Sequence, residues 1–171
     1  MVEKLQQHIE HKFSFLKEKK LLIAISGGVD SVVLTHLFHQ LNFDISLAHC
    51  NFNLRGKESD KDEGFVKNLS KNLDLKTFIT SFETEKYAKK NQLSTQVAAR
   101  DLRYNWFQEL TNAHLFDFVI TAHHADDNLE TFIINLTRGT GLEGFTGIPE
   151  INNTIVRPFL IFSRDEIENY A

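Results

Sequence analysis

The sequence predicts an α/β domain with a Rossmann-like, three-layer architecture, in which helices cover both faces of a mostly parallel, five-stranded sheet. Strand-like and helix-like segments alternate along all 171 residues, which is typical of parallel strands joined by crossover helices. The strand-like segments are short, continuous apolar runs such as residues 21–25, as expected for strands buried on both faces. Polar or glycine-rich segments follow several of these strands, at the sheet edge where open α/β folds bind their ligands.

The elements are assigned from hydrophobic periodicity and from the residues that begin each segment. Apolar residues that recur every three or four positions predict helices, and short apolar runs predict strands. Ser94 marks one helix start as an N-cap, and Asp126 with Asp127 marks another, because acidic residues favour the first turn. The expected helices span residues 2–16, 32–41, 58–73, 83–90, 94–112 and 126–137, and the expected strands span residues 21–25, 45–49, 77–82, 116–122 and 155–160.

The last residues of the chain predict a further helix. Ser163 and Glu166 have the S-x-x-E spacing of a capping box, yet the chain ends about two turns later. A helix rarely begins only to end a domain so soon. We therefore expect the 171 residues to be part of a longer protein.

Composition restricts the class of protein. Hydrophobic residues make up 42% and charged residues 25% of the chain, as in a soluble globular protein with one domain. The net charge of -4 argues against a pervasive positive field for nucleic acid but allows a local basic patch. An apolar run of about 18 residues and a signal peptide are both missing, so we expect a cytoplasmic protein without a membrane segment. The single cysteine, Cys50, excludes an internal disulfide and a C-x-x-C pair, and we expect it to be buried.

Residues 26–31 are the most informative segment, because they join the first strand to a helix. Two adjacent glycines permit positive φ angles and let the backbone approach a ligand closely. The next helix begins with free N–H groups at the positive end of its dipole, which suits a phosphate group. Asp30 can either cap this helix or reach a phosphate-bound Mg²⁺, and two serines add hydroxyl donors. The expected phosphate-binding residues are Ser26, Gly27, Gly28, Val29, Asp30 and Ser31.

Two commoner nucleotide motifs are excluded at this position. The dinucleotide fingerprint requires three glycines in G-x-G-x-x-G, and the nucleoside-triphosphate P-loop requires a lysine at the helix start; the segment has neither. An ordinary strand-to-helix turn is the weaker alternative, because a strand, two glycines and three polar side chains coincide here. The segment therefore indicates a phosphate site.

A second polar segment follows the strand expected at residues 116–122 and faces the same edge. His123 and Asp127 are four residues apart, so on one helix they would share a face and direct an imidazole and a carboxylate toward the phosphates. Carboxylates together with phosphate oxygens are the usual ligands of Mg²⁺. When this segment is considered alone, the alternative is that its acidic residues only complement the helix dipole. Zinc is not expected, because cysteine partners and the H-E-x-x-H spacing are missing.

Other polar residues at the expected edge offer contacts for a nucleobase or a second substrate. Asn51 and Arg55 follow the strand at residues 45–49, and two arginines with a tyrosine lie on the long helix, a combination that suits RNA phosphates and bases. A solvated loop and a helix face with i, i+4 pairs are the alternatives. The candidates for contacts with RNA or a second substrate are Asn51, Arg55, Arg100, Arg103, Tyr104 and Arg138.

These motifs resemble those of the N-type ATP pyrophosphatases, the PP-loop family, whose phosphate loop reads Ser-Gly-Gly-x-Asp-Ser as residues 26–31 do here. Within that family the chain is most similar to the ligases that form lysidine in tRNA. The resemblance implies an adenine nucleotide alpha hydrolase-like fold and one catalytic domain over residues 1–171, followed in such enzymes by C-terminal domains that recognise tRNA. It is carried by Ala48-His49-x-Asn51, Leu54-Arg55, Arg100-x-x-Arg103-Tyr104, Thr121-Ala122-His123-His124-x-Asp126-Asp127-x-x-Glu130-Thr131, Arg138-Gly139-x-Gly141 and Arg157-Pro158.

The same resemblance implies an enzyme that uses ATP and Mg²⁺ to attach free L-lysine to C2 of the wobble cytidine of the isoleucine tRNA with a CAU anticodon. The cytidine is adenylated with release of pyrophosphate, and the lysine amine then displaces AMP. By similarity, residues 26–31 hold the phosphates, Asp30, His123 and Asp127 are catalytic, and Asp30 and Asp127 are the candidate Mg²⁺ ligands. Because the lysine amine has an unperturbed pKa of about 10.4, a carboxylate or desolvation must favour its neutral form. The sequence does not determine the oligomeric state, and a homodimer is one of the alternatives.

Three alternatives remain at this point. A PP-loop tRNA thiolase usually has cysteine pairs or an iron–sulfur cluster, and this chain has one cysteine. An amidotransferase-linked synthetase fits the arginine-rich helix and the His-His-x-Asp-Asp block less well. A nucleotide-binding module without catalysis would not need the Asp127 carboxylate. Phe52 departs from the family pattern, which often has a histidine after Asn51, and this puts a polar role at that position in doubt.

Overall fold

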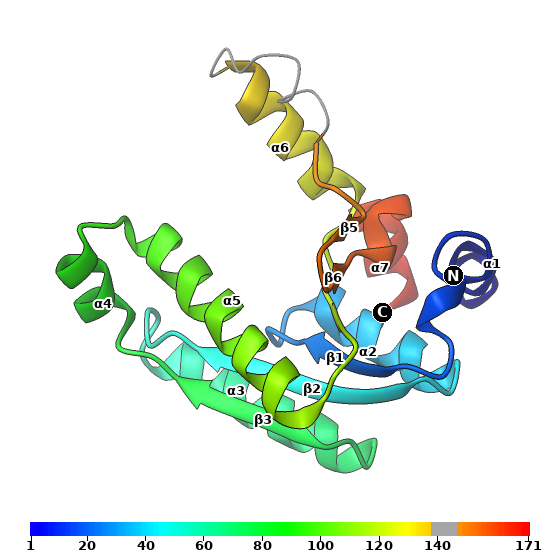
Figure 1. The fold of residues 1–171 in the computed structure, drawn as a ribbon, viewed down its shortest axis with the longest axis horizontal. Coiled ribbons are helices and arrows are strands. Elements are labelled where there is room, and N and C mark those ends of the chain that lie inside the picture. The colour runs from blue at the N-terminus through cyan, green and yellow to red at the C-terminus, as the bar shows by residue number, and fades with distance from the viewer. Residues whose placement is uncertain (138–146) are drawn as a thin grey trace.

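The computed structural model describes residues 1–137 and 147–171. Helices cover both faces of a six-stranded sheet, so the predicted three-layer α/β architecture is confirmed (Figure 1). The described strands are β1 (Lys20–Ala24), β2 (Asp44–Asn51), β3 (Thr77–Ser81), β4 (Phe118–Ile120), β5 (Ile151–Asn152) and β6 (Ile155–Val156). The described helices are α1 (Val2–Lys12), α2 (Val29–Gln40), α3 (Lys57–Asn72), α4 (Thr84–Asn91), α5 (Thr95–His114), α6 (Ala125–Thr137) and α7 (Arg164–Tyr170), with short 3-10 turns η1 (Ser14–Leu16) and η3 (Pro158–Ile161).

The strand order is β3-β2-β1-β4-β6-β5, and every pair except β5 with β6 is parallel. The chain adds β2 and β3 on one side of β1 and then returns to place β4 on the other side. Strand order thus reverses between β1 and β4, and the loops after these two strands open on the crevice where such sheets bind ligands. This topology positions the functional site.

The sheet has six strands rather than the predicted five. The additional strand, β5, has two residues and forms an antiparallel hairpin with β6 through a turn in which Asn153 adopts a φ of 53°. A two-residue strand is too short to show hydrophobic alternation, so the sequence pattern does not reveal it. The strand expected at residues 155–160 is only two residues long, because Pro158 has no N–H to continue a ladder and begins η3.

Two apolar cores hold the layers together. One core packs α1, α2, α7 and part of α3 against one face of the sheet, with Phe38, Val66 and Ile167 among its fully buried side chains. The other core packs α5 against the opposite face, where Phe107 contacts the cluster that includes Leu22. Alternate residues of each central strand enter opposite cores, which explains their continuous apolar sequence.

Several predicted boundaries shift by a few residues. The first helix ends at Lys12 instead of residue 16 and is followed by η1, the second begins at Val29 instead of residue 32, and β4 covers only part of residues 116–122. Ser94 caps α5 as predicted, with its side chain accepting a hydrogen bond from Val97 N at 3.3 Å. The capping box at Ser163 and Glu166 is also confirmed.

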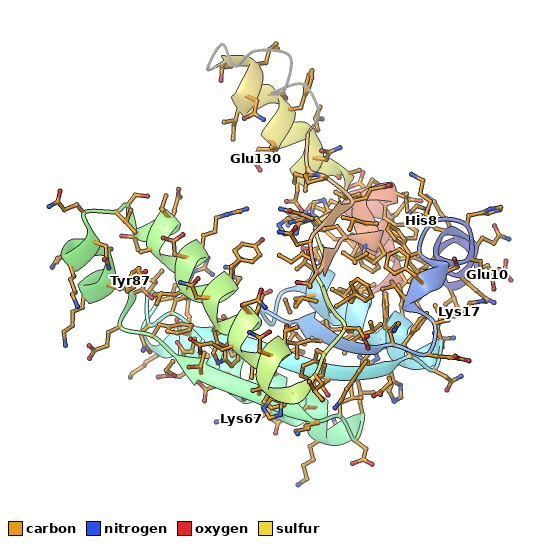
Figure 2. The ribbon with its side chains drawn as sticks, in the orientation of Figure 1. His8, Glu10, Lys17, Lys67, Tyr87 and Glu130 are labelled. Carbon is orange, nitrogen blue, oxygen red and sulfur yellow. The ribbon has the colours of Figure 1, made fainter. Side chains whose placement is uncertain are left out.

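Helix α6 projects from the body of the domain, and Figure 2 shows Glu130 on this projecting helix. None of its residues is buried. The predicted glycine-rich loop at residues 138–144 lies outside the described residues. Within the described part of the chain, no helix is long and apolar enough to cross a membrane.

Candidate active site

The phosphate loop joins β1 to α2, and its conformation is held by serine hydroxyl groups. Ser31 Oγ lies 3.1 Å from Ser26 Oγ, accepts a hydrogen bond from Ser26 N at 3.2 Å and donates to Gly28 O at 2.9 Å. Gly27 has a φ of 95°, in the region that strongly favours glycine. The two serines thus stabilise the conformation of the loop, and their hydroxyl groups are also potential donors to a ligand.

Gly28, not Asp30, is the N-cap residue of α2. Asp30 therefore does not cap the helix, because it already lies within the first helical turn, where backbone N–H groups have no partner within the helix. Val29 and Ser31 share this turn, and the first backbone bond into the helix comes from Val32 N to Gly28 O. Free N–H groups at a helix start form an anion site.

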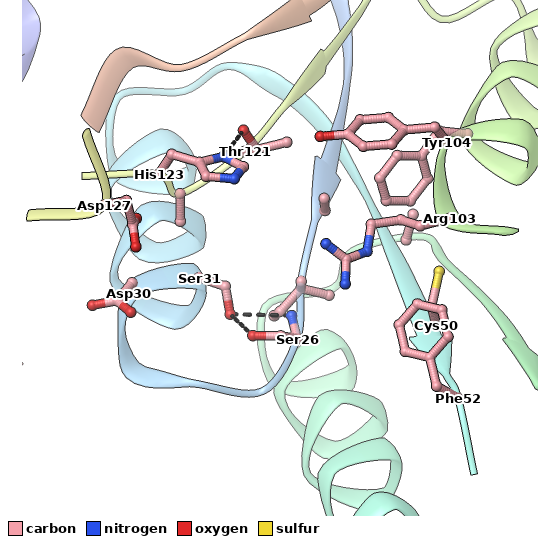
Figure 3. A pocket seen from close by; sticks show the side chains of 15 residues that line it. Ser26, Asp30, Ser31, Cys50, Phe52, Arg103, Tyr104, Thr121, His123 and Asp127 are labelled. Atoms are coloured by element: carbon pink, nitrogen blue, oxygen red, sulfur yellow. Dashed lines mark hydrogen bonds between the residues drawn. The ribbon is translucent and has the colours of Figure 1, made fainter. Parts of the chain in front are cut away.

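A cavity of about 270 Å³ lies above this loop and brings the two predicted motifs together. Figure 3 shows Asp30 and Asp127 on one side of it, His123 between them and the sheet, and Arg103 with Tyr104 on the opposite side. Ser26, Asp30, Ser31, His123 and Asp127 all line the cavity. The expectation that the loops after β1 and β4 share one crevice is therefore met.

His123 and Asp127 do not share a helix face, because α6 begins at Ala125 and His123 precedes it. The adjacent His124 is what links the carboxylates. Its Nε2 lies 3.6 Å from Asp127 Oδ2 and 4.0 Å from Asp30 Oδ2, and its backbone N donates to Asp127 Oδ2 at 2.9 Å. The two carboxylates thus converge on one buried imidazole, although they belong to different helices.

His123 is a neutral imidazole beside the phosphate loop. Burial, followed by the positive charge of Arg157, lowers its pKa from 6.5 to about 4, although Asp127 acts in the opposite direction. Its Nδ1 lies 2.8 Å from the hydroxyl of Thr121. When Thr121 donates this hydrogen bond, Nε2 carries the imidazole proton and can donate to a phosphate oxygen.

The acidic residues fit Mg²⁺ bound together with phosphates. Asp30 Oδ1 is buried and has no hydrogen-bond partner, and the Asp127 carboxylate approaches the same nitrogen, His124 Nε2, that Asp30 approaches. In the described residues, no group of three or more His, Cys, Asp or Glu side chains could hold a metal by itself. Mg²⁺ usually takes one or two carboxylates and completes its shell with water and substrate phosphates, so a pair of aspartates is an appropriate donor set.

The wall opposite the carboxylates is aromatic and basic. The Arg103 guanidinium lies 5.2 Å from the Phe52 ring centroid, and the Phe52 ring stacks on Phe82 at 5.7 Å. Phe52, the departure from the family pattern, therefore supports an arginine through its π face. Cys50 lines this wall and is only partly buried, contrary to expectation. Burial raises the pKa of its thiol to about 12, which argues against a nucleophilic role.

The remaining candidates occupy different positions. Arg55 and Arg100 line a second cavity of about 610 Å³, which adjoins the first through Ser26 and Arg103. Asn51 also borders it, but its side-chain amide donates to Glu63 Oε2 at 3.0 Å and its oxygen accepts from Asn53 N. Asn51 thus orders the loop after β2. Arg138 lies outside the described residues.

Sequence reasoning assigned no role to three residues that the structure places beside the site. Thr121 orients His123, His124 links the two carboxylates, and Arg157 acts electrostatically on His123. Each lies at or just after the end of β4 or β6 and belongs to a motif that carries the family resemblance, and these were the available signals. Their contacts depend on neighbouring strands that are distant in sequence.

The strand order, the glycine loop after β1 and the carboxylates after β4 define an α/β domain that binds a nucleotide by its phosphates. The chain belongs to the PP-loop domain family, whose model matches residues 1–171. The resemblance noted from the sequence is confirmed, and membership implies ATP as the nucleotide.

Curated relatives are similar over almost the whole chain. The tRNA(Ile)-lysidine synthase of Bacteroides thetaiotaomicron is 44% identical over 164 residues, which cover 96% of this chain and 38% of the relative. The protein of the same name from Porphyromonas gingivalis is 47% identical over 154 residues, covering 90% of this chain and 34% of the relative. A third, from Clostridium perfringens, is 39% identical over 176 residues. The chain thus spans a little over a third of the length of these relatives.

Solved structures share the fold at low sequence identity. The U34-tRNA thiolase NcsA from Methanococcus maripaludis with its [4Fe-4S] cluster superimposes with a TM-score of 0.76 at 18% identity, over 98% of this chain and 62% of that chain. The NH3-dependent NAD synthetase from Campylobacter jejuni has a TM-score of 0.64 at 18% identity, over 98% of this chain and 69% of that chain.

Proposed function

We propose that this chain is the ATP-binding catalytic domain of a ligase that joins lysine to C2 of the wobble cytidine in the isoleucine tRNA with a CAU anticodon. The observation that carries the proposal is the shared cavity of the phosphate loop, Asp127 and His123. The names of the curated relatives supply the substrate tRNA and the product, lysidine. Lysine is then the second substrate, and cytoplasm the compartment in which tRNA and ATP meet.

The first step is adenylation of the cytidine. Its O2 attacks the α-phosphorus of ATP, a new P–O bond forms, and the bond between the α-phosphorus and the bridging oxygen breaks to release pyrophosphate. The N-terminus of α2 holds the leaving phosphates with its free N–H groups. His123 Nε2 donates a hydrogen bond to an α-phosphate oxygen, where negative charge grows in the transition state.

The second step attaches lysine to the adenylated base. The neutral amine attacks C2, a C–N bond forms, and the C2–O bond breaks to release AMP. Asp30 and Asp127 would hold Mg²⁺, which neutralises phosphate charge when it is bound. Positioning and charge neutralisation carry this chemistry, so a covalent protein nucleophile is not required, in agreement with the protonated thiol of Cys50.

Arg103 and Tyr104 on α5 face the carboxylates across the cavity and would receive the tRNA anticodon loop (Figure 3). The Arg103 guanidinium over Phe52 and the Arg100 guanidinium 4.9 Å from the Tyr104 ring form a surface of alternating cations and rings. Stacking and charge of this kind suit unpaired RNA bases.

The test incubates the full-length gene product with Mg²⁺-ATP, labelled lysine and individual tRNAs. Label should enter only the isoleucine tRNA with a CAU anticodon, and AMP and pyrophosphate should form in equal amounts. The absence of label from every tRNA, with ATP bound normally, would overturn the proposal. If the protein is a nucleotide-binding module without catalysis, ATP will bind and no AMP will form.

A further inference from the structure

Arg157 is a buried cation that has no ion-pair partner among residues 1–137 and 147–171. Its residue is 3% exposed, and among the described residues no carboxylate forms an ion pair with it. One nitrogen, Nη1, donates to Pro149 O at 2.8 Å, whereas Nε is buried and has no partner. Burying a charge without a partner costs free energy, so a bound anion would stabilise this guanidinium.

A cavity of about 340 Å³ adjoins this guanidinium. Arg157 and Arg100 line it together with neutral side chains of α5 and of the β5–β6 hairpin, among them Asn105, Gln108 and Asn152. No acidic residue is among the described residues of its lining. The cavity therefore offers two positive charges and several amide groups, and Tyr104 separates it from the ATP cavity, which the same side chain also lines.

The electrostatics of His123 give independent support for an excess of positive charge here. Arg157, Arg103 and Arg100 all lower the pKa of this imidazole, and Asp127 is the one acidic group of the described residues that raises it. Arg157 exerts the largest charge effect of the four. An anion bound at Arg157 would thus lie beside the residue placed at the α-phosphate.

We propose that Arg157, with Arg100 on the facing wall, binds the carboxylate of the amino-acid substrate. A carboxylate matches the planar fork of a guanidinium in two hydrogen bonds, and Arg157 Nε is a free donor of that fork. Held by its carboxylate, the amino acid would extend its side-chain amine toward His123 and the adenylated base. The proposal rests on the proposed lysine-ligase function.

A free amino acid fits the site better than an RNA phosphodiester. The cavity volume is at the lower end of the range for small-molecule pockets, and Arg157 lies too deep for a phosphate that remains attached to a chain on both sides. ATP phosphates have their own site at the start of α2, in the cavity that Ser26, Ser31 and His123 line (Figure 3). An anion site for the second substrate leaves its amine unpaired, and a free amine is needed for attack.

The test compares lysine with cadaverine, which has the same two terminal amines and lacks the carboxylate. The full-length gene product is assayed for transfer of labelled lysine to the isoleucine tRNA, and cadaverine is added as a competitor to obtain its Ki. In Arg157→Gln the KM for lysine should rise about tenfold or more, since a hydrogen-bonded charge pair is lost, and the Ki of cadaverine should change less than about twofold. In Arg157→Lys the KM for lysine should lie between the values of the unaltered protein and of Arg157→Gln. Lys86→Gln, at an exposed residue of α4, is the control for loss of a positive charge.

Arg100→Gln provides a variant that should fold, because Arg100 is exposed. At saturating tRNA, which removes the effect of Arg100 on the proposed RNA surface, it should also raise the KM for lysine and leave the Ki of cadaverine unchanged, and this comparison decides the question if Arg157→Gln does not fold. Direct calorimetry of lysine binding in the presence of a non-hydrolysable ATP analogue gives a readout independent of turnover.

Four results would overturn the proposal. Equal losses for lysine and cadaverine indicate a structural role for Arg157, and an unchanged KM for lysine indicates no role in binding. Weaker tRNA binding with a reduced salt dependence indicates an RNA phosphate, and weaker ATP binding indicates a nucleotide phosphate. If the unaltered protein transfers no lysine at all, it is the proposed function that fails.

Discussion

His124 shows how single residues set the geometry of this site. Its Nε2 is approached by both Asp30 and Asp127, and the residue is 6% exposed, so its position is determined by packing rather than by solvent. These two carboxylates belong to helices that begin after different strands. The Mg²⁺ ion of Mg²⁺-ATP would therefore meet a pre-arranged pair of carboxylates and not a mobile surface.

Replacing Asp127 by Asn should remove catalysis and leave the fold intact. The amide keeps the size and the hydrogen bond to His124 N, but it removes the charge that would hold Mg²⁺. We expect AMP formation to fall by about 100-fold or more. Pre-steady-state release of pyrophosphate measures the effect, with Glu3→Gln on α1 as a surface control; near-normal rates in Asp127→Asn would contradict the role assigned here.

His123 predicts a pH dependence of stability. Its pKa is about 4 in the folded chain and about 6.5 unfolded, so between these values the unfolded chain binds more protons. The free energy of unfolding should thus fall as the pH drops from about 6.5 to about 4, by at most about 3 kcal/mol. Urea titrations across this range measure the slope, and His123→Gln, which does not titrate, should flatten it. An identical slope in both proteins would show that other groups are responsible.

At the scale of elements, the backbone conformation at the junction of β1 with α2 forms the expected phosphate site. The strand ends at Ala24, Gly27 turns the chain with a φ of 95°, and Gly28 caps a helix that starts at Val29. The second cap of interest, Ser94, fixes the start of α5 and hence the direction in which Arg103 meets the cavity. Both junctions are specified by residues adjacent in sequence.

Two glycine-to-alanine substitutions should therefore change the free energy of unfolding in opposite directions. Gly27→Ala places a side chain at a positive φ and should destabilise the chain by about 1–2 kcal/mol and weaken ATP binding. Gly64→Ala lies within α3, where an added Cβ meets nothing within 4 Å, and should stabilise the chain by about 0.5–1 kcal/mol. Chemical denaturation compares the two; a neutral Gly27→Ala with normal ATP affinity would argue against the loop as the phosphate site.

At the scale of the whole molecule, the site depends on the order of the strands. β4 pairs with β1 in parallel, with Phe118 opposite Leu21 and Ile120 opposite Ile23, so the segments that follow both strands leave the sheet at one edge. The hairpin of β5 and β6 extends the same edge and brings Arg157 beside the loop after β4. Three sequence segments thus meet at one crevice, and disturbing the central pairing would separate all of them.

Binding of Mg²⁺-ATP should stabilise the folded chain as a unit. A ligand at about 100 times its Kd adds roughly 2.7 kcal/mol to the free energy of unfolding, which for a domain of this size raises Tm by about 5–10 °C. Thermal unfolding with ATP, with and without a chelator, measures the shift. A chelator should reduce it if Asp30 and Asp127 act through Mg²⁺; no shift at saturating ATP would contradict a nucleotide site in the chain.

The sequence by itself determined the alternation of strands and helices, the phosphate loop at residues 26–31, the cap at Ser94 and the convergence of the loop with Asp127, because each follows from neighbouring residues and from the general topology of parallel sheets. The tertiary structure alone decided that Asn51 bonds to Glu63, that His124 links the carboxylates and that Arg157 is buried with no ion-pair partner in the described part of the chain. Local propensity cannot reveal such contacts. They join residues on different strands and helices, and only the packing of both sheet faces brings those elements together.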